Sequence, residues 1–206
     1  MRNFTISKYN LKCYLKQNKG RYLCFAFCVL VGVVVGLVIV ASSDAYLGLI
    51  TSDNKVLYSI INGTVKSSEL FWRKFMNFIV PVVLIFLLSL NYYLGLLSHL
   101  VIGYQSALFV MSVSSIISIY GISGVLNFIF LSLPINSIYI LILIHYSVVC
   151  LSRAREALHR KQIGFKVFDD EFLMHTIACV MLVLILVFAA TIVYPLFIKN
   201  AIFIIF

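Results

Sequence analysis

A long stretch of this chain carries no charged side chain. From Phe75 to Ser152 there is no Asp, Glu, Lys or Arg, and over the whole sequence 63% of residues are hydrophobic and 11% are charged. A soluble domain is typically about 25% charged. The apolar segments are long and continuous, whereas the strands of a membrane barrel would alternate every second residue. The sequence therefore predicts an all-α, polytopic transmembrane helical bundle.

Hydropathy and local breaks divide the chain into about five membrane spans, all within a single transmembrane domain over residues 1–206. The third of the three crossings in the uncharged block is expected to be broken near Pro134, or to contain a re-entrant half-helix over residues 124–133, because an apolar piece of about 10–14 residues is too short to span alone. The predicted spans are Tyr22–Ala41, Phe75–Leu90, Gly95–Tyr120, the broken crossing that contains Pro134, and Phe172–Ile198.

The first span has a competing interpretation as a cleaved signal peptide, because it follows a basic start and ends in small residues. Its apolar run is about twenty residues long, whereas the apolar region of a signal peptide has about 7–15. An uncleaved span is therefore the favoured interpretation.

The basic residues predict how the chain is oriented in the membrane. One cluster precedes the first span, and a second lies between residues 153 and 166. Cytoplasmic segments of membrane proteins are enriched in Lys and Arg. We therefore expect a multi-pass membrane protein with a cytoplasmic N-terminus. The net charge of +9 is explained by these flanks, and without a basic groove interleaved with aromatic residues no nucleic-acid partner is predicted.

Two segments outside the spans have amphipathic patterns. Residues 1–21 place Lys8, Lys12 and Lys16 at helical spacing, which is typical of a basic helix lying on the anionic lipids of the inner leaflet. Residues 44–74 lie outside the cell in this topology and carry an apolar helical stripe. This stripe is the predicted binding site for extracytoplasmic partners: Val56, Leu57, Ile60 and Ile61.

Small residues inside the spans predict close helix packing. Gly32 and Gly36 form a Gly-x-x-x-Gly motif, which lets another helix backbone approach closely. The partner helix could belong to the same chain or to a second copy in a homo-oligomer, and the sequence favours neither. Gly103 and Gln105 place a small and a polar residue near each other, and amides in membrane helices commonly form interhelical hydrogen bonds.

The polar inventory of the uncharged block argues against catalysis. Enzymes that work within the membrane need a buried carboxylate, a catalytic dyad or metal ligands. His99 and His145 alone do not make a metal site, and the chain has no phosphate-binding loop and no nucleophile elbow. We therefore predict no catalytic residues, no metal, no cofactor and no enzymatic activity.

Several short motifs, taken in order, resemble one known family. They are Asn18-Lys19-Gly20-Arg21-Tyr22, the Gly32/Gly36 span, an apolar hairpin with Gly95 and Gly103, Tyr120-Gly121-Ile122-Ser123-Gly124, and Leu133-Pro134-Ile135-Asn136. Together they resemble the stage II sporulation protein M family of bacterial multispanning membrane proteins, over nearly the whole chain.

The resemblance implies a non-catalytic membrane scaffold that recruits a cell-wall (peptidoglycan) hydrolase complex during engulfment in sporulation. It also implies a structural role in helix packing for Gly32, Gly36, Gly103, Pro134 and Asn136. The segment over residues 44–74 is then the expected place for the hydrolase complex to bind.

A second hypothesis is a permease-like subunit that depends on a separate ATPase. It is motivated by the Gly and Pro breaks in the uncharged block, which are typical of the discontinuous helices at transporter sites. This hypothesis predicts a polar cavity formed by His99, Gln105 and Asn136.

Overall fold

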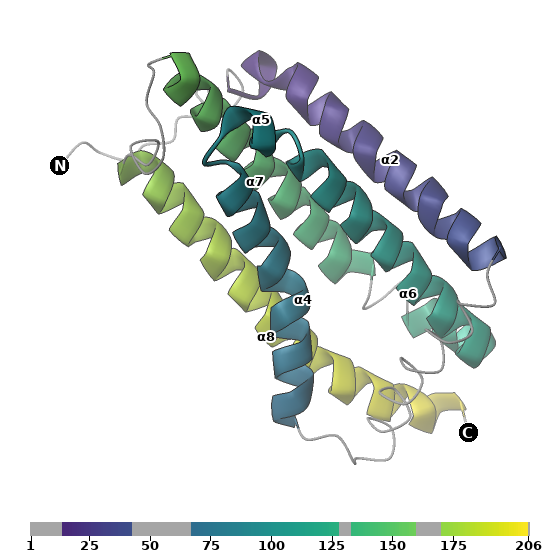
Figure 1. Ribbon diagram of the computed structural model, residues 1–206. Coiled ribbons are helices and arrows are strands. Elements are labelled where there is room, and N and C mark those ends of the chain that lie inside the picture. Colours follow the sequence, from purple (N-terminus) through teal and green to yellow (C-terminus); the bar gives the residue numbers. More distant parts are fainter. Residues whose placement is uncertain (1–13, 43–66, 128–132, 160–169, 206) are drawn as a thin grey trace.

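The structure is a computed structural model that describes residues 14–42, 67–127, 133–159 and 170–205 (Figure 1). Within these ranges the chain is a bundle of α-helices without a β-strand. In the described part of the chain, five helices are long and apolar enough to cross a membrane. The helices are α2 (Lys19–Ser42), α4 (Ser67–Leu88), the short α5 (Tyr92–Gly95), α6 (Ser98–Asn127), α7 (Leu133–His159) and α8 (Asp170–Ile205).

The break between the third and fourth spans differs from the one expected at Pro134. Helix α6 continues through Gly121 and Gly124 to Asn127, and Pro134 is the second residue of α7. A glycine inside a helix costs roughly 1 kcal/mol, whereas an unsatisfied backbone group in hydrocarbon costs several kcal/mol, so the helix continues. Proline fits the first turn of a helix because its missing N–H has no intrahelical acceptor there.

Helices α2 and α6 lie side by side and run in the same direction (Figure 1). The hairpin formed by α4, the short α5 and α6 reverses the chain between them. Asn91 begins α5, and its side-chain Oδ1 accepts a hydrogen bond of 2.9 Å from the backbone N–H of Tyr93. The chain between the predicted spans Phe75–Leu90 and Gly95–Tyr120 therefore forms a short capped helix.

Helix α7 is the central helix of the bundle. Half of its most apolar window is buried, compared with 17% for α2 at the edge. Its buried Tyr139 donates a hydrogen bond of 2.9 Å to the carbonyl oxygen of Phe78 in α4, one turn before Pro81. The core around α7 draws on every long helix and includes Phe25, Ile85, Ile102, Leu143, Tyr146, Phe172, Val183 and Val187.

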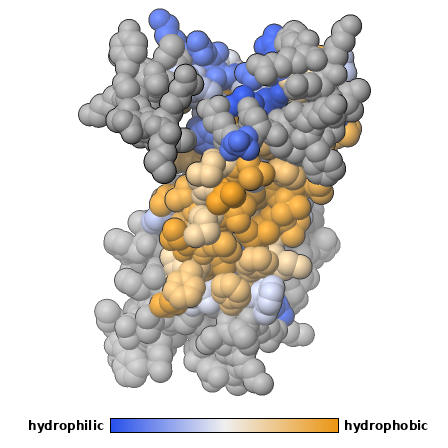
Figure 2. Space-filling view, turned by 90° about the vertical axis from the view of Figure 1, so that its left-hand side faces the viewer, coloured by the Kyte–Doolittle hydropathy of each residue, from blue (hydrophilic) through white to orange (hydrophobic). Residues whose placement is uncertain are grey.

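The outer surface of the bundle is apolar where a soluble protein would be polar. Leu30, Leu100, Leu141, Ile185 and Phe188 are each at least 60% exposed. Figure 2 shows one such face as an apolar belt below a polar band at one end of the molecule. An apolar belt is stable only against lipid. The fold therefore defines a multi-pass membrane protein, and we call the end with Lys19, Arg21, Arg153 and Arg155 the basic end.

Candidate functional site

Small residues of α2 and α6 make a very close contact between these two membrane helices. A Cβ atom added to Gly32 would overlap the carbonyl oxygen of Gly103, and one added to Gly36 would lie 2.9 Å from the carbonyl oxygen of Ala107. The two helices are parallel, so the i, i+4 spacing of Gly32 and Gly36 matches that of Gly103 and Ala107. We call these four residues the glycine seam.

In the structure, the glycine seam lies within one chain. The backbone of α6 at Gly103 occupies the groove that Gly32 and Gly36 form on α2. The sequence interpretation missed Ala107. The signal was present as Gly103-x-x-x-Ala107, a second pair of small residues at the spacing that favours helix association.

An aromatic stack lies next to the seam, toward the basic end. The rings of Phe25 and His99 are nearly parallel, at 6°, with their centroids 4.0 Å apart. The Nδ1 atom of His99 also lies 2.8 Å from the carbonyl oxygen of Leu96, to which it donates a hydrogen bond. His99 therefore serves as a packing partner of the fully buried Phe25.

A second set of contacts joins the start of α2 to α7 at the basic end. Arg21 Nη1 donates a 2.6 Å hydrogen bond to Asn18 Oδ1 and a second hydrogen bond to the hydroxyl of Ser152. The Nδ2 atom of Asn18 donates to the carbonyl oxygen of Tyr14. These residues hold the segment before α2 against the end of α7.

The phenol of Tyr14 completes this group. Burial raises the pKa of Tyr14, and the hydrogen bond to Ser152 and the positive charge of Arg21 offset part of that rise. The phenol is therefore protonated at neutral pH. We call Tyr14, Asn18, Arg21 and Ser152 the basic-end cluster.

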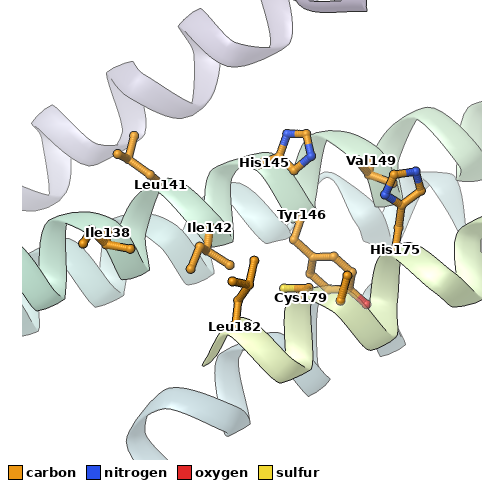
Figure 3. Close-up of a pocket in the computed structure, with 10 residues that line it drawn as sticks. Ile138, Leu141, Ile142, His145, Tyr146, Val149, His175, Cys179 and Leu182 are labelled. Atoms are coloured by element: carbon orange, nitrogen blue, oxygen red, sulfur yellow. The ribbon is translucent and has the colours of Figure 1, made fainter. Parts of the chain in front are cut away.

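A pocket of about 360 Å³ lies between α7 and α8 and extends from the basic end into the membrane (Figure 3). Its polar members are His145, Tyr146 and His175, and the rest of its lining is mainly aliphatic. The hydroxyl of Tyr22 on α2 lies 2.8 Å from Nδ1 of His145, so α2 also reaches the rim. No motif in the sequence paired His145 with His175, because the antiparallel packing of α7 and α8 brings them together.

The residues predicted to form a polar cavity do not gather at this pocket. His99 lies in the first turn of α6 and Asn136 in the first turn of α7, and these helices run in opposite directions (Figure 1). The two residues therefore lie toward opposite ends of the bundle. Gln105 is half-buried on α6, Asn136 is half-buried, and Pro134 is exposed. The predicted partner-binding residues Val56, Leu57, Ile60 and Ile61 lie outside the described residues.

The described helices offer few groups that could perform chemistry. Among the residues with a described position, no three His, Cys, Asp or Glu side chains gather in an arrangement that could hold a metal ion. Glu156 lies near the end of α7 and forms an ion pair of 3.3 Å with Arg153. Hydroxyls inside the spans, such as those of Ser106 and Thr191, donate to carbonyl oxygens one turn earlier in their own helices.

No protein-family model, curated protein or solved structure matches the chain.

Proposed function

We propose that this chain is a non-catalytic membrane scaffold, similar in role to stage II sporulation protein M. The observation that carries the proposal is that the small and polar residues of the spans make contacts between one helix and another. The glycine seam joins α2 to α6, and Arg21 and Tyr22 join α2 to α7 through Ser152 and His145. These residues hold helices together, which is what a scaffold needs.

The ends of the bundle are where a scaffold would meet its partners. The segment over residues 43–66 begins after Ser42 at the end of α2 and ends before Ser67 at the start of α4. Both flanking helices are packed into the bundle, so the attachment points of the segment are fixed. We propose that Val56, Leu57, Ile60 and Ile61 contact an extracytoplasmic protein, such as a peptidoglycan hydrolase complex.

The proposed location is the bacterial cell membrane, with the basic end in the cytoplasm. Lys19, Arg21, Arg153 and Arg155 lie at this end, in accord with the enrichment of basic residues in cytoplasmic segments. The opposite end, with Ser42 and the first turn of α4, then faces the outside.

The permease alternative receives no support from a specific observation. It requires His99, Gln105 and Asn136 to surround one polar cavity. His99 is stacked on Phe25, and Asn136 lies toward the other end of the bundle. The pocket that reaches into the membrane has mainly aliphatic walls.

The test is an affinity pull-down of the full chain from membranes dissolved in mild detergent. The scaffold proposal expects a cell-wall hydrolase or another extracytoplasmic protein to copurify with the wild type, and to be lost when Ile60→Glu and Ile61→Glu are combined. The matched control combines Thr51→Glu with Ser52→Glu, which adds the same charge to the same segment outside the apolar stripe and should keep the partner.

Two results would contradict this proposal. One is retention of every partner by the Ile60/Ile61 variant. The other is recovery of a cytoplasmic ATPase that is indifferent to both pairs of changes, which would favour the permease instead.

A further inference from the structure

The pocket between α7 and α8 is an open groove with apolar walls. Leu141 is 65% exposed, Leu182 is 50% exposed and Ile138 is 48% exposed, although all three line it. Its volume of about 360 Å³ lies at the lower end of the range of about 300–1,000 Å³ that is typical of small-molecule sites. The exposed walls belong to two membrane spans, so the groove opens sideways into lipid.

One end of the groove is polar, and this is the end nearest the basic end of the bundle. His145 and His175 face the same space from α7 and α8 (Figure 3). Tyr22 brings a phenol hydroxyl to His145 from α2. These three side chains offer hydrogen-bond donors at the rim, while the aliphatic side chains line the deeper part.

A cation lies just beyond this rim. His145, Val149 and Ser152 are spaced i, i+4 and i+7, so they share one face of α7. Ser152 accepts a hydrogen bond from Arg21. Among the described residues, the hydrogen-bond partners of Arg21 Nη1 are the neutral oxygens of Asn18 and Ser152, so this guanidinium retains its charge for an anion.

The charge at this end is predominantly positive. Lys19 and Arg21 lie on α2, and Arg153 and Arg155 lie on α7. The described acids here are Glu156, which pairs with Arg153, and Asp170 and Glu171 at the start of α8.

The aliphatic part of the groove is somewhat shorter than one leaflet of the bilayer. From Ile138 to His145, where the polar end begins, the lining of α7 covers seven steps of the helix, 145 − 138 = 7, or roughly 10 Å at about 1.5 Å per residue. Half of the hydrocarbon core of a bilayer is roughly 15 Å thick. An acyl chain along the aliphatic wall would therefore cover most of the distance between the headgroup level and the bilayer midplane.

We propose that this groove binds an anionic glycerophospholipid of the leaflet at the basic end, with an acyl chain along Ile138, Leu141 and Leu182 and the headgroup phosphate near His145, His175 and Arg21. The phosphate accepts hydrogen bonds from the imidazoles and is attracted by the guanidinium. A bound lipid of this kind bridges α2, α7 and α8 on the face where they leave the groove open. The proposal does not depend on the scaffold role.

Charge complementarity favours an anionic lipid over a zwitterionic one in this groove. A zwitterionic lipid would fill the same apolar wall but would also bring a cationic group to an end that is already basic. Charge-assisted hydrogen bonds to a phosphate are shorter and stronger than neutral ones. We therefore expect a preference for phosphatidylglycerol over phosphatidylcholine of about tenfold in dissociation constant.

The test is native mass spectrometry of the full chain, delipidated in detergent and titrated with phosphatidylglycerol or phosphatidylcholine with identical acyl chains. Leu141→Trp places a bulky ring in the groove and should weaken phosphatidylglycerol binding by about tenfold or more. Leu100→Trp is the matched control, because Leu100 is 70% exposed on α6 and does not line the groove, and it should leave binding unchanged. Arg21→Gln should retain a lipid but bring the preference between the two headgroups close to one.

Three results would overturn the proposal. Equal effects of Leu141→Trp and Leu100→Trp would show that lipid is not held in the groove. An unchanged headgroup preference in Arg21→Gln would remove the role of Arg21. A dimer of the chain that Leu141→Trp dissociates would assign the groove to a second copy.

Discussion

Gly32 of α2 lies directly against the backbone carbonyl of Gly103 in α6, with no space for even a methyl group between them. Two membrane helices approach this closely only where both lack side-chain bulk. Lipid tails are as apolar as the helix surfaces, so close van der Waals packing replaces the hydrophobic effect as the attraction between them. Helix α2 is therefore fixed against α6.

The glycine seam predicts that alanine substitution at two glycines of α2 has opposite effects on the free energy of unfolding. We expect Gly32→Ala to lower the free energy of unfolding by about 1–3 kcal/mol, because the added methyl overlaps backbone atoms and forces the helices apart. Gly20→Ala is the control, since nothing lies within 4 Å of its added Cβ, and alanine should stabilise the helix there by about 0.5–1 kcal/mol. Denaturant titration in detergent measures both, and equal effects would argue against the seam.

The stack of Phe25 on His99 predicts that burial, rather than hydrophobicity, decides which phenylalanine of α2 stabilises the bundle. Phe25 is fully buried, and Phe27 is 65% exposed. We expect Phe25→Ala to destabilise the bundle by about 3–5 kcal/mol, as for large-to-small changes in cores. Phe27→Ala faces lipid in both the folded and the separated helix and should change stability by less than about 0.5 kcal/mol. Thermal unfolding of the two variants gives the comparison, and a similar loss from both would contradict the packing.

The hydrogen bond from Tyr139 to the carbonyl oxygen of Phe78 predicts a smaller, specific effect. Tyr139→Phe removes the hydroxyl and keeps the ring, so we expect a loss of about 0.5–1.5 kcal/mol, the usual net contribution of a hydrogen bond. Tyr93→Phe also removes a phenol hydroxyl, but Tyr93 is 68% exposed. This change should leave the free energy of unfolding nearly unchanged. Chemical denaturation of both variants under the same conditions separates them. No difference between them would mean that this bond does not stabilise the bundle.

The proposed orientation predicts which cysteine replacements a membrane-impermeant maleimide can reach. In a background without native cysteines, Ser42→Cys should react in intact cells. Lys19→Cys and Arg155→Cys should react only after the membrane is permeabilised, because both lie at the basic end. Labelling of Lys19→Cys in intact cells would reverse the orientation. The exposed side chains of all three positions make them suitable for this measurement.

The membrane spans could be predicted from the sequence because lipid insertion depends on the average polarity of about twenty consecutive residues. Tyr22–Ala41 lies inside α2, and Phe172–Ile198 lies inside α8. The breaks were harder to place. Gly121 and Gly124 favour a turn in water, but within α6 their backbone groups are hydrogen-bonded in a helix, which hydrocarbon strongly favours.

The candidate site also combines features that could be predicted from the sequence with features that could not. The Gly-x-x-x-Gly motif in α2 was visible as a packing motif, but the identity of its partner was not, since a groove of small residues accepts any matching helix. Ala107 became relevant only when α6 was found beside α2 in parallel register. The pairing of His145 with His175, and of Tyr22 with His145, depends on which helix faces each residue.

The sequence by itself determined that this protein is a helical membrane protein with about five spans and one basic end, because these properties follow from how each segment is solvated. Tertiary structure alone decided that the glycines of α2 pack against α6 within the chain, and that α7 and α8 leave a groove lined by two histidines. The reason is physical. In lipid, every apolar helix face is equally well solvated, so only close contact and hydrogen bonds between particular residues select the neighbours.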